Sequence, residues 1–210
     1  LRIMPAETIL TLNAGSSSIK FALYAARQSL DVHLRGQVEN IGGAAMLQVR
    51  TVNEAKPTHP VDVKDHAGAL RQILDVVQSR SNGARIAAVG HRITHGGPDF
   101  AEPHILNDAS LAKLRGYMAW APLHQPYNIA AVEGASDVFP DAIQVGCFDT
   151  GFHRGHPWVS DAYALPRRYY DQGLRRYGFH GISYRSVGRQ LATLAPGIAM
   201  GKVVVAHLGN

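Results

Sequence analysis

Two segments of the chain combine residues that could bind or move an anionic group. The first, at positions 13–20, reads Asn-Ala-Gly-Ser-Ser-Ser-Ile-Lys, so a β-rich run gives way to small hydroxyl residues, a glycine and a lysine. Backbone N–H groups and hydroxyls in such a loop can converge on an anion. The spacing is not that of a Walker loop, and a strand rather than a helix is expected to follow. Composition alone supports an ordinary serine-rich hairpin turn equally well.

The second segment, at 90–97, reads Gly-His-Arg-Ile-Thr-His-Gly-Gly and ends an expected strand. The guanidinium of Arg92 offers a planar fork for a carboxylate or a phosphoryl group, and the glycines allow close backbone approach. His91 and His95 lack a third metal ligand at a recognisable spacing, so substrate contact is favoured over metal binding. The alternative is that both histidines satisfy buried backbone groups.

Two further segments place polar residues at the ends of expected elements. Asp149 directly follows an apolar strand, where it could hold Mg²⁺ through water or orient a nucleophile, or could simply cap the next element of the chain. Cys147 lies within that strand and is interpreted as a small buried hydrophobe. Residues 175–181, Arg-Arg-Tyr-Gly-Phe-His-Gly, lead into an expected helix. The positive end of that helix would suit charge on a transferring group.

The elements that must position these residues are predicted from hydrophobic periodicity. Alternating runs predict antiparallel strands at 7–13, 18–25, 30–38 and 46–52. Apolar positions at helical spacing then predict a helix over 65–80. After it the chain alternates, with strands expected at 85–93, 142–148 and 202–208 and helices at 126–137, 183–194 and from 108. This order predicts an α/β fold with a mixed β-sheet and flanking helices.

Composition narrows the class of protein and its partners. The 210 residues are 46% hydrophobic and 18% charged, which indicates a globular domain, and no apolar run approaches the roughly 20 residues of a membrane span. A single cysteine and no signal-peptide pattern favour a cytoplasmic protein. The net charge of +5 comes from scattered Lys and Arg. We therefore expect phosphate or carboxylate substrates, with no nucleic-acid or membrane partner.

Taken in order, these segments resemble the acetate kinase family, whose members exchange phosphate between ATP and acetate. Further matching blocks are Ala-Pro-Leu-His at 121–124, Tyr-Gly-Phe-His-Gly at 177–181 and His-Leu-Gly-Asn at 207–210. The resemblance runs from about Ile9 to the last residue. It implies an actin-like ATPase (ribonuclease H-like) domain of the acetate and sugar kinase superfamily. Residues 1–210 are similar to the family's N-terminal domain, so we expect the nucleotide-binding half to lie beyond Asn210.

The resemblance also implies a role for each matching position. The residues implied to be catalytic are Arg92, Asp149 and His180. The residues implied to bind the acyl substrate are Arg92, Thr94, Leu123, His124 and Phe179. The residues implied to contact the nucleotide are Asn13, Ser16, Ser18, Lys20, His207, Gly209 and Asn210. Asn13 is also the implied metal contact, and the implied cofactors are Mg²⁺ and ATP or ADP.

The implied reaction is direct, reversible in-line transfer of the γ-phosphoryl group of ATP to acetate, giving acetyl phosphate and ADP. Acetate is already a carboxylate nucleophile, so the chain needs no strong general base. The resemblance implies a homodimer at full length and an inactive chain in isolation.

Three alternatives remain open: a propionate or other short-chain acyl kinase, a non-catalytic anion-binding fragment, and a butyrate or sugar kinase. The six blocks disfavour the last. Thr94 stands where the family pattern leads us to expect an aliphatic residue, which leaves the acyl preference open. Further departures from the family pattern are Gln125, Ile182 and Tyr184.

Overall fold

The computed structural model describes residues 7–27, 30–51, 58–81 and 83–208, and the chain divides into two compact units. The first unit comprises residues up to Ile93 together with His104–Gly146. The second unit comprises Thr94–Pro103 and the residues from Cys147 onward. That residues 1–210 correspond to one N-terminal domain of the family stays a prediction.

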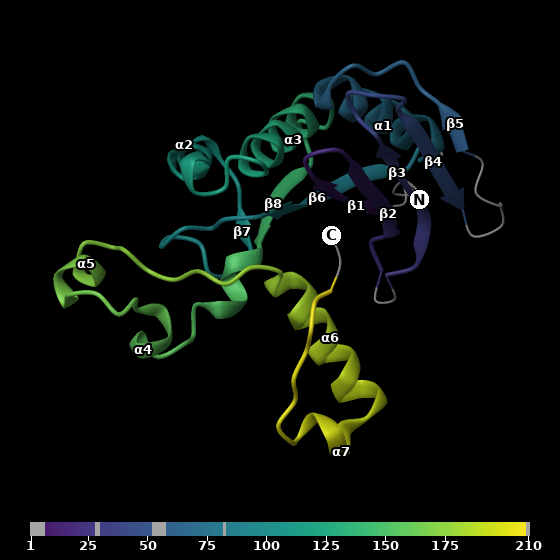
Figure 1. Ribbon diagram of the computed structural model, residues 1–210. Coiled ribbons are helices and arrows are strands. Elements are labelled where there is room, and N and C mark those ends of the chain that lie inside the picture. Colours follow the sequence, from purple (N-terminus) through teal and green to yellow (C-terminus); the bar gives the residue numbers. More distant parts are fainter. Residues whose placement is uncertain (1–6, 28–29, 52–57, 82, 209–210) are drawn as a thin grey trace. The chain divides into compact units, whose positions relative to one another are not determined.

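The predicted mixed sheet is present, and in the described residues it has eight strands (Figure 1). Its strand order is β5-β4-β3-β2-β1-β6-β8-β7. Strands β1 to β5 pair antiparallel in sequence order, β1 pairs parallel with β6, and β7 pairs antiparallel with β8. The strands are β1 (Glu7–Ala14), β2 (Ile19–Ala25), β3 (Val32–Glu39), β4 (Met46–Thr51), β5 (Thr58–Pro60), β6 (Arg85–Ile93), β7 (His104–Ile105) and β8 (Ile143–Phe148).

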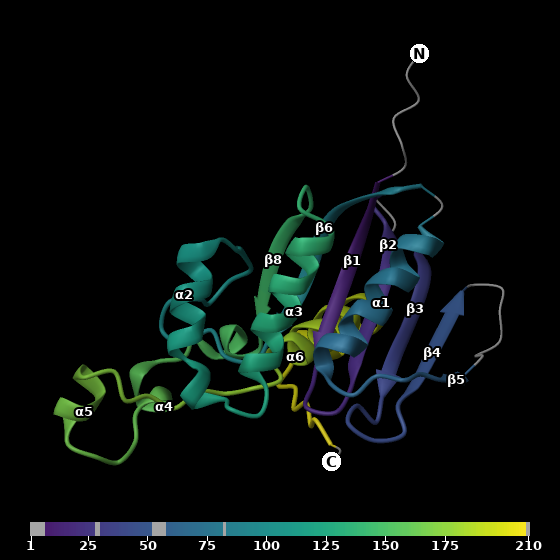
Figure 2. The same ribbon diagram turned by 90° about the horizontal axis from the view of Figure 1, so that it is seen from above.

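Three helices belong to the first unit, and two of them, α1 and α3, contact each other and the central strands (Figure 2). They are α1 (His66–Arg80), α2 (Asp108–Gly116) and α3 (Gln125–Val138), with a 3₁₀ turn η1 at Met118–Trp120. Asp65 caps α1 by accepting the N–H of Gly68 at 2.7 Å. Asn107 caps α2 in a reciprocal bond pair with Ser110. These caps agree with the polar residues that precede each apolar run.

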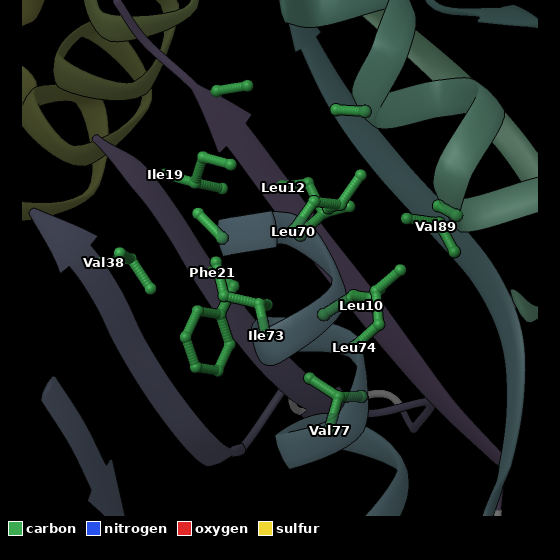
Figure 3. Close-up of a cluster of buried hydrophobic side chains, with 14 of the residues drawn as sticks. Leu10, Leu12, Ile19, Phe21, Val38, Leu70, Ile73, Leu74, Val77 and Val89 are labelled. Atoms are coloured by element: carbon green, nitrogen blue, oxygen red, sulfur yellow. The ribbon is translucent and has the colours of Figure 1, made fainter. Parts of the chain in front are cut away.

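The hydrophobic core of the first unit forms where α1 lies against the sheet (Figure 3). The helix predicted over 65–80 is present, and four of its apolar residues at helical spacing are buried there: Leu70, Ile73, Leu74 and Val77. The strands bury alternate residues against them, among which Leu10, Leu12, Ile19 and Phe21 are at most 3% exposed. Burial on one face of each strand fixes the register of the sheet, because a slip of one residue would expose the whole apolar set.

The second unit is mainly helical and carries one correction. It contains η2 (Asp149–His153), α4 (Trp158–Asp161), α5 (Arg167–Asp171), α6 (Gly181–Leu194) and α7 (Pro196–Ala199). Helix α6 begins two residues before the predicted Ser183. The predicted strand at 202–208 is wrong, since these residues have no regular secondary structure. A β-rich sequence becomes a strand only by pairing, and no described strand pairs with this segment. No helix in the described part of the chain has the length and apolarity needed to cross a membrane.

We predict that Ile73→Ala destabilises the first unit by about 2–5 kcal/mol, because it removes a fully buried side chain and leaves a cavity under α1. Urea denaturation followed by circular dichroism measures the effect. Arg71→Ala on the exposed side of the same helix is the control and should change the free energy of unfolding by less than about 0.5 kcal/mol. Equal effects of the two substitutions would contradict the packing described here.

Candidate functional site

Two predicted site residues, Asn13 and Arg92, meet at the ends of adjacent parallel strands. The β1–β6 register pairs Leu12 with His91, so the next residues of both strands lie side by side at their carboxyl ends. Arg92 Nη1 donates a hydrogen bond to Asn13 Oδ1 at 3.2 Å. Both residues are half-buried. Ligands of open α/β sheets usually bind at this edge.

Lys20 joins this group from the other side of β1. It pairs directly with Asn13 across the antiparallel β1–β2 ladder, and directly paired residues project from the same face of a sheet. Its neighbour Ile19 projects to the other face and is 1% exposed, whereas Lys20 is exposed. Three adjacent strands thus place an amide and two cationic side chains on one face, which is an arrangement suited to an anion.

The loop between β1 and β2 is a tight turn whose serines lie at the surface. The N–H of Gly15 donates to the carbonyl of Ser18 at 2.8 Å and closes the turn. Ser16 and Ser17 are exposed, and Ser18 is half-buried. The hairpin interpretation and the anion-loop interpretation are therefore compatible, because the turn leaves its hydroxyls accessible.

Leu123 and His124 lie just before α3 in the first unit. Leu123 is 70% exposed, an unusual position for a large aliphatic side chain. His124 occupies the N-cap position of α3 without making a capping hydrogen bond, and its buried Nδ1 has no hydrogen-bond partner among the described residues. Leu123 is therefore exposed to solvent, whereas His124 carries a buried polar atom that the described residues do not satisfy.

In the second unit, Asp149 is almost fully buried at the start of η2. The N-cap position of η2 belongs to Phe148 and has no side-chain capping bond, so capping does not account for Asp149. A Cβ added to Gly181 would lie 2.2 Å from the backbone oxygen of Asp149. The first residue of α6 therefore packs directly on the Asp149 backbone, and only glycine fits there.

His180 precedes that glycine in a left-handed conformation, with φ of 58°. Few residues other than glycine adopt this conformation, and such cases cluster at functional sites. The imidazole of His180 stacks on that of His207 with ring centroids 4.1 Å apart and planes 9° apart. The structure thus brings together two histidines that are 27 positions apart in the sequence, and both are exposed.

Thr94 and Phe179 also lie in the second unit. Thr94 is 5% exposed, and Phe179 is 37% exposed. The Phe179 ring packs edge-on against His95, and its carbonyl accepts a hydrogen bond from His153 Nε2 at 2.9 Å. His95 Nδ1 accepts the N–H of Gly97 at 2.9 Å. His95 is therefore a buried structural histidine, as the alternative in the sequence analysis held.

His91 is also buried, but its hydrogen bond goes to a side chain rather than to a backbone group, and its buried Nδ1 has no hydrogen-bond partner among the described residues. Its Nε2 donates to Gln144 Oε1 at 2.8 Å, and Gln144 is itself fixed by donating to the carbonyl of Ala142 at 3.0 Å. Burial lowers the pKa of His91 to about 4, although the Gln144 hydrogen bond opposes this. Burial, reinforced by Arg154, also lowers the pKa of His95 to about 4. Both rings are thus neutral at pH 7.

The remaining predicted positions add no metal cluster to the site. Gly209 and Asn210 lie outside the described residues. Within the described ranges, no group of three or more His, Cys, Asp or Glu side chains could hold a metal. Cys147 is half-buried, and burial raises its thiol pKa despite the opposing charge of Arg185.

Sequence reasoning did not find Gln144, His66 or Asn128, since their roles depend on contacts 51 to 114 positions away in the chain.

The lowered pKa values predict a loss of stability in mild acid. An unfolded histidine binds a proton below pH 6.5, whereas folded His91 binds one only below about 4. The free energy of unfolding therefore keeps its full value above pH 6.5 and decreases as the pH falls from 6.5 to 4. The loss at His91 should be of order 3 kcal/mol, measured by urea denaturation across that range. In His91→Leu the pH dependence should be shallower. An identical slope in this variant would contradict the assignment.

Comparison with known proteins agrees with this geometry. Residues 8–210 match the Acetokinase family model. The acetate kinase of Methylocella silvestris is 47% identical over 96% of this chain and 53% of its own, and that of Rhizobium meliloti is 43% identical over 97% and 53%. The chain spans about half the length of these curated relatives.

Solved structures give the same result. A propionate kinase from Francisella tularensis has a TM-score of 0.80 and 31% identity, covering 90% of this chain and 49% of its own. Porphyromonas gingivalis acetate kinase has a TM-score of 0.79 and 35% identity, covering 91% and 49%. These neighbours confirm the predicted fold of the acetate and sugar kinase superfamily. The matched sequence, the fold and the paired Asn13 and Arg92 together show that the chain belongs to the acetokinase family.

Proposed function

We propose that this protein transfers the γ-phosphoryl group of ATP reversibly to the carboxylate of acetate, forming acetyl phosphate and ADP. The observation that carries the proposal is the Asn13–Arg92 hydrogen bond at the carboxyl ends of β1 and β6, with Lys20 on the same face. The relatives named acetate kinase supply the substrate class. Because the chain spans about half of their length, the activity is proposed for the protein as its cells make it.

Arg92 is the proposed contact to acetate or to the transferring phosphoryl group. Phosphoryl transfer requires in-line positioning and stabilisation of charge on three equatorial oxygens, and little covalent chemistry from the protein. A guanidinium can meet two of those oxygens with two parallel N–H bonds. The bond to Asn13 orients the guanidinium before substrate arrives, which lowers the cost of ordering it.

Asp149 and His180 are the proposed catalytic residues of the second unit. The Asp149 carboxylate would lie near the metal and the attacking carboxylate, and His180 would stabilise the transferring group by donating a hydrogen bond. Contact of Gly181 with the Asp149 backbone fixes both residues to one local framework. Stacking on His207 limits rotation of the His180 ring. Direct in-line transfer with no phosphoenzyme is consistent with these roles.

The donor atoms present fit a magnesium ion that arrives with the nucleotide. Mg²⁺ is usually held by one or two carboxylates together with substrate phosphates. By family resemblance, Asn13 with its amide oxygen is the proposed metal contact and Asp149 is proposed to act near the metal, and the described residues contain no cluster of three or more His, Cys, Asp or Glu side chains that could hold a metal by itself. When bound, Mg²⁺ would neutralise phosphate charge. Ser16, Ser18, Lys20 and His207, together with Gly209 and Asn210, are the proposed contacts to the nucleotide phosphates.

By family resemblance, the residues proposed to contact the acyl substrate besides Arg92 are Leu123 and His124 of the first unit and Thr94 and Phe179 of the second unit. A second candidate substrate is propionate, because one solved neighbour is a propionate kinase. By family resemblance we also propose a cytoplasmic homodimer. A protein that binds anions without transferring phosphate remains an outcome of the tests below.

We predict that Arg92→Ala lowers kcat by about 10³-fold, because it removes the charge that stabilises the transferring group. A coupled assay of ADP formation in the presence of acetate measures kcat. Arg50→Ala, an exposed arginine on β4, is the matched control and should leave kcat unchanged. Near-normal turnover by a folded Arg92→Ala would contradict the assignment, whereas wild-type protein that binds ADP without turnover would favour the anion-binding alternative.

We predict that Thr94→Val raises kcat/KM for propionate relative to acetate by about threefold, because an apolar wall favours the longer acyl chain. The comparison needs kcat/KM for both acids in wild type and variant, with the KM for ATP as the internal control. An unchanged ratio of the two kcat/KM values would remove Thr94 from the acyl pocket.

A further inference from the structure

Two side chains of the first unit hold consecutive carbonyl groups of the β1–β2 loop. Asn128 Nδ2 donates to the carbonyl oxygen of Ala14 at 2.8 Å, and His66 Nε2 donates to that of Gly15 at 2.8 Å. Because a carbonyl can only accept, the neutral His66 ring must carry its proton on Nε2. The loop carbonyls are therefore anchored by α1 and α3, the helices that carry these two residues.

Backbone groups hold two further carbonyls of the same loop. The oxygen of Ser17 accepts the N–H of Ile41 at 3.1 Å, and the oxygen of Ser18 accepts the N–H of Gly15 at 2.8 Å. Four of the five carbonyl groups of residues 14–18 are thus engaged by the protein.

The hydrogen-bond donors of Ser16 and Ser17 in this loop, by contrast, are not engaged by the protein. No hydrogen bond joins the N–H or hydroxyl groups of Ser16 and Ser17 to another residue in the described part of the chain. Carbonyl oxygens repel an anion, and N–H and hydroxyl groups bind it. A loop with four of its five carbonyls engaged and the donors of Ser16 and Ser17 open is therefore suited to an anion.

His66 is itself held in place. It is the first residue of α1, which Asp65 caps, and its ring stacks on Tyr127 of α3 with centroids 3.9 Å apart and planes 21° apart. The neighbouring Asn128 is 1% exposed. Contact between α1 and α3 therefore sets the position of both donors, so the loop conformation is fixed by the core of the unit rather than by the loop sequence alone.

We propose that His66 and Asn128 are positioning residues, which engage the carbonyls of loop 14–18 and leave its donors free for nucleotide phosphates. The inference rests on the proposed function only in taking a nucleotide as the anion. It predicts that loss of the His66 donor weakens nucleotide binding and spares acetate binding. A residue that only stabilised the fold would lower the melting temperature without separating the two substrates.

The test uses His66→Ala, His66→Leu and His66→Gln in the full-length protein. In the first two variants, we expect the Kd for ADP, measured by titration calorimetry, and the KM for ATP to rise about fivefold to tenfold, while the KM for acetate is unchanged. His66→Gln keeps an N–H donor and should restore most of the loss. His33→Ala, an exposed histidine of β3, is the matched control with wild-type values.

Wild-type ADP affinity in folded His66→Ala or His66→Leu would overturn the proposal, as would an equal rise in KM for ATP and acetate. His66→Leu retains side-chain bulk and serves if the alanine variant fails to fold. Failure of the proposed function would look different. A wild-type protein that binds ADP but shows no turnover would contradict the proposed function, and the effect of the His66 variants on ADP affinity could still be measured. Absence of ADP binding in wild type would overturn both.

Discussion

Parallel pairing of β1 with β6 is the constraint on which the candidate site depends. It aligns the carboxyl ends of two strands separated by some 70 residues of chain, and so places the Asn13 amide against the Arg92 guanidinium. The pairing is stable because the other face of these strands buries Leu10, Leu12 and Val89 against α1 and its neighbours. A mutation in that core would therefore displace Asn13 and Arg92 even though the mutated residue contacts neither of them.

Polar groups near the site are organised by the same core. Burial keeps His91 neutral at pH 7, although its hydrogen bond to Gln144 favours the charged form, so the residue next to Arg92 adds no second positive charge there. Asn128 of α3 and His66 of α1 hold the β1–β2 loop in place through their hydrogen bonds to its carbonyls. In the second unit, Gly181 plays a comparable part by letting α6 start on the Asp149 backbone. Each proposed catalytic side chain thus rests on a fixed backbone segment.

Much of this arrangement could be predicted from the sequence where the signal was local. Alternation predicted β1 to β4 of the antiparallel part but not the short β5, and β6 was predicted with the bounds observed, Arg85–Ile93. Helix α1 was predicted over 65–80 because the helical spacing of apolar residues such as Leu70, Ile73 and Leu74 is a local property. The strand predicted at 202–208 failed because strand formation depends on a partner, which local sequence does not reveal. His66 and Asn128 were missed because their bonds span 51 and 114 positions.

The most direct test of the central claim traces the phosphate itself. Full-length protein would be incubated with Mg²⁺, acetate and ATP labelled in the γ-phosphoryl group, and the label would be measured in acetyl phosphate, in inorganic phosphate and on the protein. Our account predicts label in acetyl phosphate, dependent on acetate, with none retained on the protein. Label released only as inorganic phosphate, or absent from acetyl phosphate while ATP is bound, would contradict it.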